Sequence, residues 1–339
     1  MIFMHKFLSV FIYEEESIYK GVELMEKTFE NSFKHTPVLL NECLEGLNIK
    51  SDGIYVDGTL GGGGHSEEIL KRLTTGKLIA FDKDDDALAH TSQKLSKYGD
   101  KVIFVKSDFK LMYEKVRELG IQQVDGILLD LGVSSYQIDT PDRGFSYRFD
   151  AKLDMRMDRT SSLTAYEVVN TYSREDLIRI LYNYGEENFA KAIVNKIVEA
   201  RNGKNIETTG ELVSLIESAI PKKFWGKGSV AKKTFQAIRI EVNGELDGLD
   251  VAINKMIDLL NPQGRLAIIT FHSLEDRIVK QVFKLRSLDC ICDKTIPVCI
   301  CNHKSDIVLV SKKPIEATKE ELENNKRSSS AKLRILEKK

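Results

Sequence analysis

Residues 56–70, VDGTLGGGGHSEEIL, hold four consecutive glycines followed by a histidine. A short apolar run that ends at Asp57 precedes the glycines, and a segment with the apolar spacing of a helix follows them. Glycine permits positive φ angles and close approach of the backbone, while a helix N-terminus presents N–H donors with partial positive charge. This order of strand, glycines and helix predicts a loop that holds a nucleotide-like ligand, and it argues against a flexible linker.

The same succession of apolar run and amphipathic segment continues beyond the glycines. The predicted strands are residues 54–57, 77–82, 101–105 and 124–130. The predicted helices between them are residues 66–73, 87–95 and 111–119. Strands that alternate with helices are typical of βαβ units, whose parallel sheet is covered by helices on both faces. The sequence therefore predicts an α/β domain.

This alternation stops after Leu131. Residues 134–160 are polar, aromatic and irregular, and helical spacing dominates residues 165–219. Strand character returns at residues 265–271, after further helical segments and a predicted turn at residues 261–264. We interpret this as a helical insertion between the fourth and fifth strands. Our domain assignment gives residues 25–137 and 233–339 to the α/β domain and residues 138–232 to the inserted helical domain.

Bulk properties exclude several classes of protein. The 339 residues include 50 Lys plus Arg and 51 Asp plus Glu, so a nucleic-acid site has to be a local patch. The apolar stretch at residues 7–13 is too short to span a bilayer, and no signal-peptide cleavage site follows it. Five cysteines in a chain of this length do not make a disulfide scaffold. We expect a cytoplasmic protein without a membrane partner.

Both ends of the chain carry expectations of their own. Residues 1–24 are predicted to be a non-native or disordered extension, with Met25 as the true initiator. The closing segment KRSSSAKLRILEKK, residues 326–339, has six basic residues around three serines. Two interpretations of this segment stay open, a solvated charged end and a contact to nucleic acid.

Asp82 narrows the class of ligand. It ends the second predicted strand about twenty residues after the glycines, where a carboxylate can accept hydrogen bonds from both ribose hydroxyls. A dinucleotide and S-adenosylmethionine both contain ribose. Asp57, Asp108 and Asp130 also lie at or just beyond strand ends, so the same edge of the sheet is acidic. A sulfonium cation tolerates such an edge better than a pyrophosphate does, which favours S-adenosylmethionine.

Ten stretches, in this order along the chain, carry a resemblance to one family. They are HTPVLLNECLEGL (35–47), YVDGTLGGGGHS (55–66), FDKD (81–84), DGILLDLGVSSYQ (125–137), RGFS (143–146), LDMRMD (153–158), YGEENFAKAIV (184–194), TFQAIRIEVNGEL (234–246), FHSLEDRIVK (271–280) and RSSSAKLR (327–334). Together they resemble the RsmH or MraW family of bacterial methyltransferases. The resemblance implies a Rossmann-like class I S-adenosylmethionine-dependent methyltransferase domain with an inserted helical domain. It also implies methylation of the exocyclic N4 of a decoding-site cytosine in 16S rRNA, within the small ribosomal subunit. A methyltransferase that acts on another RNA or on a small molecule, and a non-catalytic ribosome-assembly factor, stay open as alternatives.

The resemblance further implies which residues contact the cofactor, S-adenosyl-L-methionine. They are Gly63, Gly64, His65, Asp82, Phe109, Asp130 and Gln137. Gly61 and Gly62 are expected to serve the turn instead. Tyr136 stands where the family usually has proline. The family's reaction needs no metal, and the sequence leaves the oligomeric state open, with a homodimer as one option.

Asp130 is the candidate for accepting a proton from the amino group that is methylated. A cytosine amino group has its lone pair spread into the ring, and acceptors for its protons localise that pair as the new bond forms. Asp130 is our candidate catalytic acceptor, and a carboxylate that only holds the cofactor is the open alternative. Methylation at C5 would need a cysteine nucleophile on a sheet-edge loop. Cys43 precedes the first strand and the other cysteines lie near the C-terminus, which argues against that reaction.

Two sets of residues are candidates for holding RNA, because splayed RNA is bound by aromatic and basic side chains. The first is Arg143, Phe145, Tyr147, Arg156 and Arg159, and the second is Lys222, Lys223, Trp225, Lys227, Lys232 and Lys233. Near the C-terminus, Cys290, Cys292, Cys299 and Cys301 form C-x-C-x6-C-x-C. Zinc ribbons usually have two residues inside each cysteine pair, so a zinc site is left open and no metal is assigned.

Overall fold

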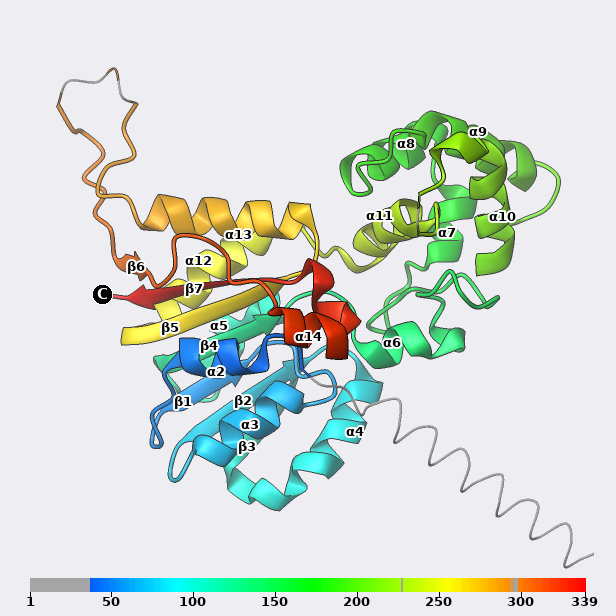
Figure 1. Cartoon of the computed structure of the whole chain (residues 1–339). Helices are drawn as coiled ribbons and strands as arrows, with labels where there is room; N and C mark the ends of the chain where they lie inside the picture. Colours follow the sequence, from blue (N-terminus) through cyan, green and yellow to red (C-terminus); the bar gives the residue numbers. More distant parts are fainter. Residues whose placement is uncertain (1–36, 227, 294, 296–297) are drawn as a thin grey trace, which may run out of the picture. The chain divides into compact units, whose positions relative to one another are not determined.

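A seven-stranded sheet organises the α/β part of the molecule (Figure 1). The computed structural model describes residues 37–339 apart from 227, 294, 296 and 297. Across those residues the strands lie in the order β3-β2-β1-β4-β5-β7-β6. Their bounds are β1 (Ile54–Asp57), β2 (Lys77–Asp82), β3 (Val102–Lys106), β4 (Val124–Asp130), β5 (Leu260–Thr270), β6 (Ile307–Leu309) and β7 (Lys332–Lys338).

The first five strands run parallel, and β7 is antiparallel to both of its neighbours. The strand order reverses at β1, which pairs with β2 on one side and β4 on the other. In open parallel sheets a ligand binds beyond the carboxyl ends of the strands at such a reversal. The loops after β1, β2 and β4 therefore frame the place where a ligand is expected.

Helices cover both faces of the sheet because strand side chains alternate between two cores. Tyr55 and Leu78 pack in one core, and their chain neighbours Val56 and Ile79 pack in the other. The first core is covered by α2 (Leu40–Leu47), α3 (Gly64–Arg72) and α4 (Asp85–Leu95). The second is covered by α5 (Met112–Glu118), α12 (Leu249–Leu259) and α13 (Ser273–Arg286). The predicted α/β class is confirmed.

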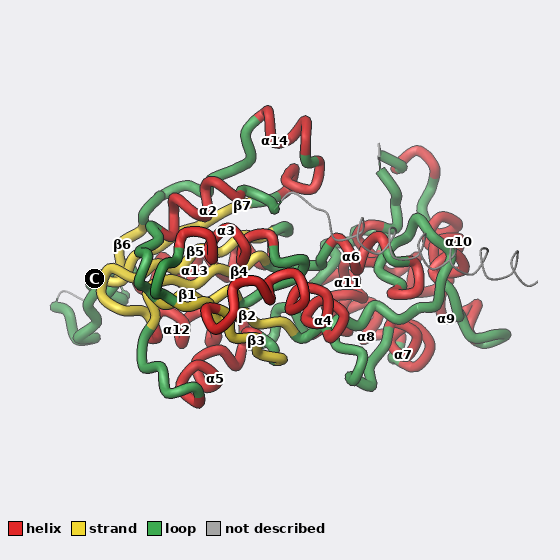
Figure 2. Tube along the Cα trace, turned by 90° about the horizontal axis from the view of Figure 1, so that it is seen from below, coloured by secondary structure: helices red, strands yellow, loops and turns green. Residues whose placement is uncertain are grey.

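The segment between β4 and β5 forms a helical lobe with a core of its own. Figure 2 shows its helices gathered away from the strands. They are α7 (Ala165–Thr171), α8 (Arg174–Asn183), α9 (Ala190–Arg201), α10 (Thr209–Ala219) and α11 (Lys232–Asn243), and the short α6 (Ser135–Asp139) precedes them. Phe235, Ile238 and Val242 of α11 are buried in this lobe's core. The lobe's core therefore extends to residue 242.

The C-terminal segment departs from both of its predicted interpretations. Residues 332–338 are β7, an inner strand that pairs with β5 through Ile269 and Leu333 and with β6 through Leu309 and Leu336. Its apolar side chains are buried in the sheet. Before it lie α14 (Lys319–Asn324) and a short 3-10 helix, Lys326–Ser330. The basic residues dominated the sequence pattern, but the apolar residues between them determine the structure.

A smaller difference concerns residues 261–264, which were predicted as a turn before the fifth strand. The structure includes them in β5, with a register irregularity against β4 between Val124 and Gly126. Gln263 takes a positive φ of 67° there, so turn-like backbone is absorbed into the strand as an irregularity.

Three further predictions concern membrane spans, the N-terminal extension and Lys227. Among the described residues, no helix is both long enough and apolar enough to cross a membrane. The predicted extension at residues 1–24 and the proposed initiator Met25 lie outside the described residues, as does Lys227 of the second basic set.

Candidate functional site

The glycine loop between β1 and α3 needs its glycines for two different reasons. Gly63 has φ 68° and is the N-cap of α3, and a Cβ there would lie 2.4 Å from Thr91 Cγ2. A Cβ on Gly64 would lie 2.3 Å from Pro37 Cγ. Gly61 also has a positive φ, 47°, but the nearest atoms to an added Cβ are 3.9 Å away. Close packing thus excludes side chains at Gly63 and Gly64, while a Cβ at Gly61 would make only ordinary van der Waals contacts and is disfavoured by the positive φ alone.

Asp82 connects this loop to the end of β2. Its Oδ2 accepts a hydrogen bond of 2.8 Å from the Gly61 N–H, and its Oδ1 accepts one of 2.9 Å from the Asp84 N–H. Burial raises the pKa of Asp82 to about 6, against the lowering effect of these two amides. The carboxylate therefore fixes the turn at Gly61, and a further acceptor position on each oxygen is available to hydroxyl donors.

Asp57 supports the loop from beneath. It is buried, and its carboxylate accepts hydrogen bonds of 2.7 Å from Ser66 Oγ and 3.0 Å from the Thr59 N–H. Burial raises the pKa of this carboxyl. Sequence reasoning placed Asp57 near a cationic ligand, but the structure shows its carboxylate bonded within the loop.

His65 lies between two elements of the site. Its Nε2 is 3.0 Å from the Val38 carbonyl oxygen, and its Nδ1 is 3.8 Å from Asp130 Oδ2. Burial lowers the pKa of His65, although the nearby Asp57 acts in the opposite direction. Nε2 donates to the carbonyl when it carries the proton, which leaves Nδ1 facing Asp130 as an acceptor.

Asp130 is a group at this edge whose bonding is incomplete. Its Oδ1 is buried and has no hydrogen-bond partner among the described residues, while its backbone N–H donates to Thr59 Oγ at 2.6 Å. Burial, with smaller contributions from Asp57 and Glu275, raises the pKa of Asp130 to about 8. A buried polar atom without a partner is costly, and such atoms are typical of functional sites.

The remaining two predicted contacts, Gln137 and Phe109, lie in the loops after β4 and β3. The Gln137 Oε1 accepts from the Ser134 N–H at 3.0 Å as part of the α6 capping box, and its Nε2 donates to Asp84 at 2.7 Å. Phe109 begins a short 3-10 helix, Phe109–Leu111, and packs beside Gly58. The structure thus gathers all seven predicted residues around the carboxyl ends of β1 to β4.

The first set of predicted RNA contacts needs a correction. Arg143 is buried, and its guanidinium donates to Asp84 at 2.8 Å and to Asp86 at 3.0 Å. Phe145 is buried in the core of the helical lobe. A charge or ring that is enclosed in this way cannot stack on a splayed base. Sequence reasoning assigned Arg143 to a surface because its partners lie almost sixty positions earlier in the chain.

The second basic set keeps an exposed face. The Trp225 indole N–H donates to the Ile220 carbonyl at 2.9 Å, and the ring is 39% exposed. Next to it, Phe224 is 55% exposed, and Lys223 Nζ lies 5.0 Å from the centre of its ring. Phe224, which sequence reasoning missed, thus joins the two lysines and the tryptophan on the short 3-10 helix Lys222–Phe224 and its C-cap.

A cavity of about 290 Å³ lies beside the site and was not predicted. It is lined by Lys83, Lys106, Ser107, Asp108, Asp158, Ser161, Val242 and Asn243. Its walls come from the loops after β2 and β3 and from the helical lobe. Lys83 Nζ is 3.3 Å from Asp108 Oδ2 in this wall, so one of its cations is already paired.

Comparison with known proteins settles the family. The model of the MraW methylase family matches residues 32–339. The chain belongs to the MraW methylase family. This confirms the resemblance found in the sequence, and a family of methylases agrees with the predicted methyl donor, S-adenosylmethionine.

Curated MraW relatives are similar over nearly their whole length. One from Finegoldia magna is 58% identical over 308 residues, which cover 90% of this chain and 99% of the relative. One from Clostridioides difficile strain 630 is 53% identical over 308 residues, with the same two shares. Both are named ribosomal RNA small subunit methyltransferase H. A relative from Agathobacter rectalis, of the same name with the suffix 2, is 55% identical over 309 residues, covering 90% of this chain and 98% of its own.

Proposed function

We propose that this chain transfers a methyl group from S-adenosylmethionine to the exocyclic N4 of a decoding-site cytosine in 16S rRNA. The observation that carries the proposal is the 58% identity, across 99% of its length, to a relative named ribosomal RNA small subunit methyltransferase H. The choice of N4 and of the decoding-site cytosine rests on the motifs of the sequence, such as DGILLDLGVSSYQ at residues 125–137. The small ribosomal subunit is accordingly the proposed partner.

The residues at the carboxyl edge of the sheet fit the proposed cofactor. S-adenosylmethionine supplies an electrophilic methyl carbon on a sulfonium sulfur. The proposed contacts are Gly63, Gly64, His65, Asp82, Phe109, Asp130 and Gln137. Two observations support the fit: the acceptor carboxylate of Asp82 beside Gly61, and the buried Asp130 Oδ1 without a partner among the described residues. The first suits the hydroxyls of an adenosine ribose, and the second suits a polar or cationic group.

Asp130 has two candidate roles that the geometry supports. As an acceptor, Oδ1 of the ionised carboxylate would take a proton of the cytosine amino group, so that the nitrogen lone pair forms the bond to the methyl carbon while the carbon–sulfur bond breaks and leaves a neutral thioether. As a holder, the carboxylate would bind the amino-acid end or the cation of the cofactor. In both roles His65 positions Asp130, because its Nδ1 faces Oδ2 and leaves Oδ1 directed elsewhere.

The second basic set is our proposed RNA contact. Phe224 and Trp225 offer exposed rings for stacking, and Lys222 and Lys223 add positive charge next to them. Aromatic rings beside cations are the usual means of holding unpaired bases and their phosphates. The site needs such a contact because the target cytosine has to leave its stack before N4 can reach the methyl group.

Nucleoside mass analysis of 16S rRNA tests the activity. We expect N4-methylated cytidine to be lost in cells that lack this gene and restored by the intact gene, but not by a gene encoding Asp130→Asn. Persistence of the modified nucleoside in the deletion strain would refute the proposal. A matched control is Asp52→Asn, which changes an exposed carboxylate and should restore methylation fully.

Calorimetry on the same variant separates the two roles of Asp130. If Asp130 is the acceptor, Asp130→Asn binds S-adenosylmethionine within a few-fold of the wild-type affinity while methyl transfer falls by about 10²–10³-fold. If Asp130 only holds the cofactor, affinity and transfer fall together. Retained transfer with retained affinity would exclude both roles.

A further inference from the structure

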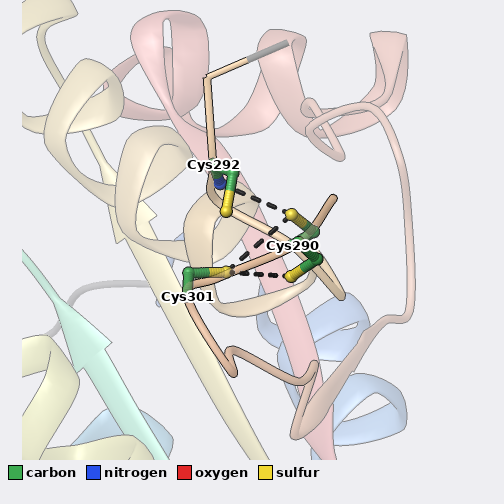
Figure 3. A group of neighbouring side chains, drawn as sticks. Cys290, Cys292 and Cys301 are labelled. Carbon is green, nitrogen blue, oxygen red and sulfur yellow. Dashed lines mark hydrogen bonds between the residues drawn. The ribbon is translucent and has the colours of Figure 1, made fainter. Parts of the chain in front are cut away.

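Four cysteines converge in the segment between α13 and β6, outside the site described above. The Sγ atoms of Cys290, Cys292, Cys299 and Cys301 all lie within 4.8 Å of one another. Figure 3 shows the labelled sulfur atoms of Cys290, Cys292 and Cys301 turned toward one another. Residues from two arms of the segment, one around 290–292 and one around 299–301, therefore present their thiols to a common point.

The distances between the sulfurs match a tetrahedral metal site. Cys301 Sγ is 3.6 Å from Cys299 Sγ and 3.8 Å from Cys290 Sγ. A tetrahedral zinc ion with Zn–S bonds of about 2.3 Å holds its sulfurs about 3.8 Å apart. A disulfide would require about 2.05 Å, and all four cysteines are free thiols. The observed spacing is that of ligands around one ion.

Backbone amides already point at three of these sulfurs. The Ile291 N–H donates to Cys301 Sγ at 3.5 Å, and the Cys292 N–H donates to Cys290 Sγ at 3.4 Å. From the second arm, the Ile300 N–H donates to Cys292 Sγ at 3.4 Å. Amide donors stabilise thiolates, which are the form that binds metal. Each arm thus donates a backbone hydrogen bond to a sulfur of the other arm. This arrangement is expected when both arms bind the same ion.

The apolar side chains that the structure describes in this segment do not explain its compact shape. They face solvent, with Ile291 50% exposed, Val298 70% and Ile300 72%. A short segment without buried apolar area needs a covalent or metal cross-link to hold its conformation. The cysteines are the side chains that bring its two arms together.

We propose that Cys290, Cys292, Cys299 and Cys301 bind one structural zinc ion. Four thiolates complete a tetrahedron and leave no open position for substrate, so the ion has a structural role. His303 is not a fifth candidate, because its Nε2 lies 3.2 Å from the Leu285 carbonyl oxygen. The spacing C-x-C within each pair differs from zinc ribbons, but the two arms meet face to face, so each pair supplies adjacent corners.

The site lies at the opposite edge of the sheet from Asp130. Ile307 of β6 pairs with Lys338 of β7, one step beyond the pairing of Glu337 with Arg265 in the middle of β5. Asp130 pairs with Ile269, next to the last residue of β5. Loss of the ion is therefore expected to release the segment locally without displacing the residues of the methyl-transfer site.

Metal analysis of the intact purified chain tests this proposal. We expect inductively coupled plasma mass spectrometry to find about one zinc ion per chain. The double variant Cys292→Ser/Cys299→Ser should hold less than about a tenth of that amount. Cys43→Ala is the matched control, since Cys43 is buried in the sheet domain and should leave the zinc content unchanged. Cobalt substitution should give the visible absorption of a tetrahedral thiolate complex in the wild type and the control only.

Three results would overturn the zinc assignment. The first is a native chain purified without chelator that carries no metal and in which all four cysteines of the cluster titrate as free thiols. The second is peptide mapping that finds disulfides among the four cysteines after anaerobic purification. The third is iron in place of zinc, with the colour of a ferric thiolate. Because the readout is metal content, failure here leaves the proposed methyl transfer untouched.

Discussion

Arg143 of the segment after β4 donates a hydrogen bond of 2.8 Å to Asp84, the N-cap of α4, and both side chains are at least 98% buried. The same guanidinium also donates to the carbonyls of Arg156 and Met157. Asp84 in turn accepts from Gln137, so one carboxylate joins the loop after β2, α6 and the start of the helical lobe. The ion pair therefore holds together segments that frame the proposed cofactor site.

Replacing Arg143 by methionine should strongly destabilise the protein. The change leaves Asp84 buried without its cation, and breaking such a pair typically costs about 3–5 kcal/mol. Arg159→Met is the control. Arg159 is half exposed and lies 3.8 Å from Asp86, a distance typical of a weak ion pair, so its loss should lower the free energy of unfolding by less than about 1 kcal/mol. Chemical denaturation of both variants gives the comparison. Equal losses in the two variants would contradict the importance of the buried pair.

Asp130→Asn should stabilise the fold, and more so as the pH rises. The pKa of Asp130 is raised from 3.8 to about 8, so between these values the folded chain keeps a proton that the unfolded chain releases. The free energy of unfolding of the wild type therefore falls as the pH rises through this window, and the asparagine variant lacks that loss. We expect the variant to gain about 2 kcal/mol at pH 8 and little at pH 4, by denaturation at both pH values.

The control for Asp130→Asn is Asp52→Asn, which removes an exposed negative charge. It should show no gain that grows with pH. If the Asp130 variant followed the same pH dependence as the wild type, the buried carboxyl would not be the source of the effect. Stabilisation together with lost methyl transfer would mark Asp130 as a group kept for function at the expense of stability.

Gly63→Ala should destabilise through Thr91 as well as through the backbone. The positive φ of 68° disfavours any Cβ by about 1 kcal/mol, and the new atom would lie 2.4 Å from Thr91 Cγ2. We expect a loss of about 2–4 kcal/mol by chemical denaturation. Gly248→Ala is the matched control, because Gly248 is also a helix N-cap in the left-handed region, with φ 64°, ψ 14° and nothing within 4 Å, and it should show the backbone cost alone.

A second substitution isolates the contact with Thr91. Thr91→Ser removes Cγ2 but keeps the hydroxyl that donates to the Gly61 carbonyl at 2.7 Å. The double variant Gly63→Ala/Thr91→Ser should recover about half of the lost free energy. Additive losses in the double variant would show that Thr91 is not what excludes a side chain at residue 63.

Leu333→Ala tests the position of the C-terminal strand. Leu333 is fully buried and pairs with Ile269, so truncating it should cost about 2–5 kcal/mol of unfolding free energy. Lys332→Ala, the adjacent and partly exposed position, should stay within about 0.5 kcal/mol of the wild type. If both variants matched the wild type in thermal and chemical denaturation, the segment would be the solvated tail that its charge suggests.

The local sequence pattern was sufficient to predict the strands in the first half of the sheet. The strands β1, β2 and β4 match their predicted bounds because each is an apolar run bounded by polar residues or glycine. The helices α3 and α4 begin two residues earlier than predicted, since their capping residues, Gly63 and Asp84, precede the first apolar position. The positions of Asp82 and Asp130 followed from the rule that parallel strands end at one edge.

Long-range pairing accounts for what local pattern missed. Nothing near Arg143 in the sequence indicates an acid partner, because Asp84 and Asp86 come from the far side of two βα units. The strand β7 was hidden because its lysines and arginine alternate with Leu333, Ile335 and Leu336, whose burial depends on β5 and β6. The convergence of the four cysteines likewise depends on how two arms of one segment fold back, which spacing does not encode.

The place of β7 in the sheet also governs when the fold can form. The ribosome delivers residues 332–338 after every other strand, yet they occupy the position between β5 and β6. Until then, β5 has an unpaired edge and β6 has no sheet neighbour among the strands of the described chain. Nascent or truncated chains would expose that edge to other strands and to proteases. Synthesis of the last strand and completion of the sheet are thus one event.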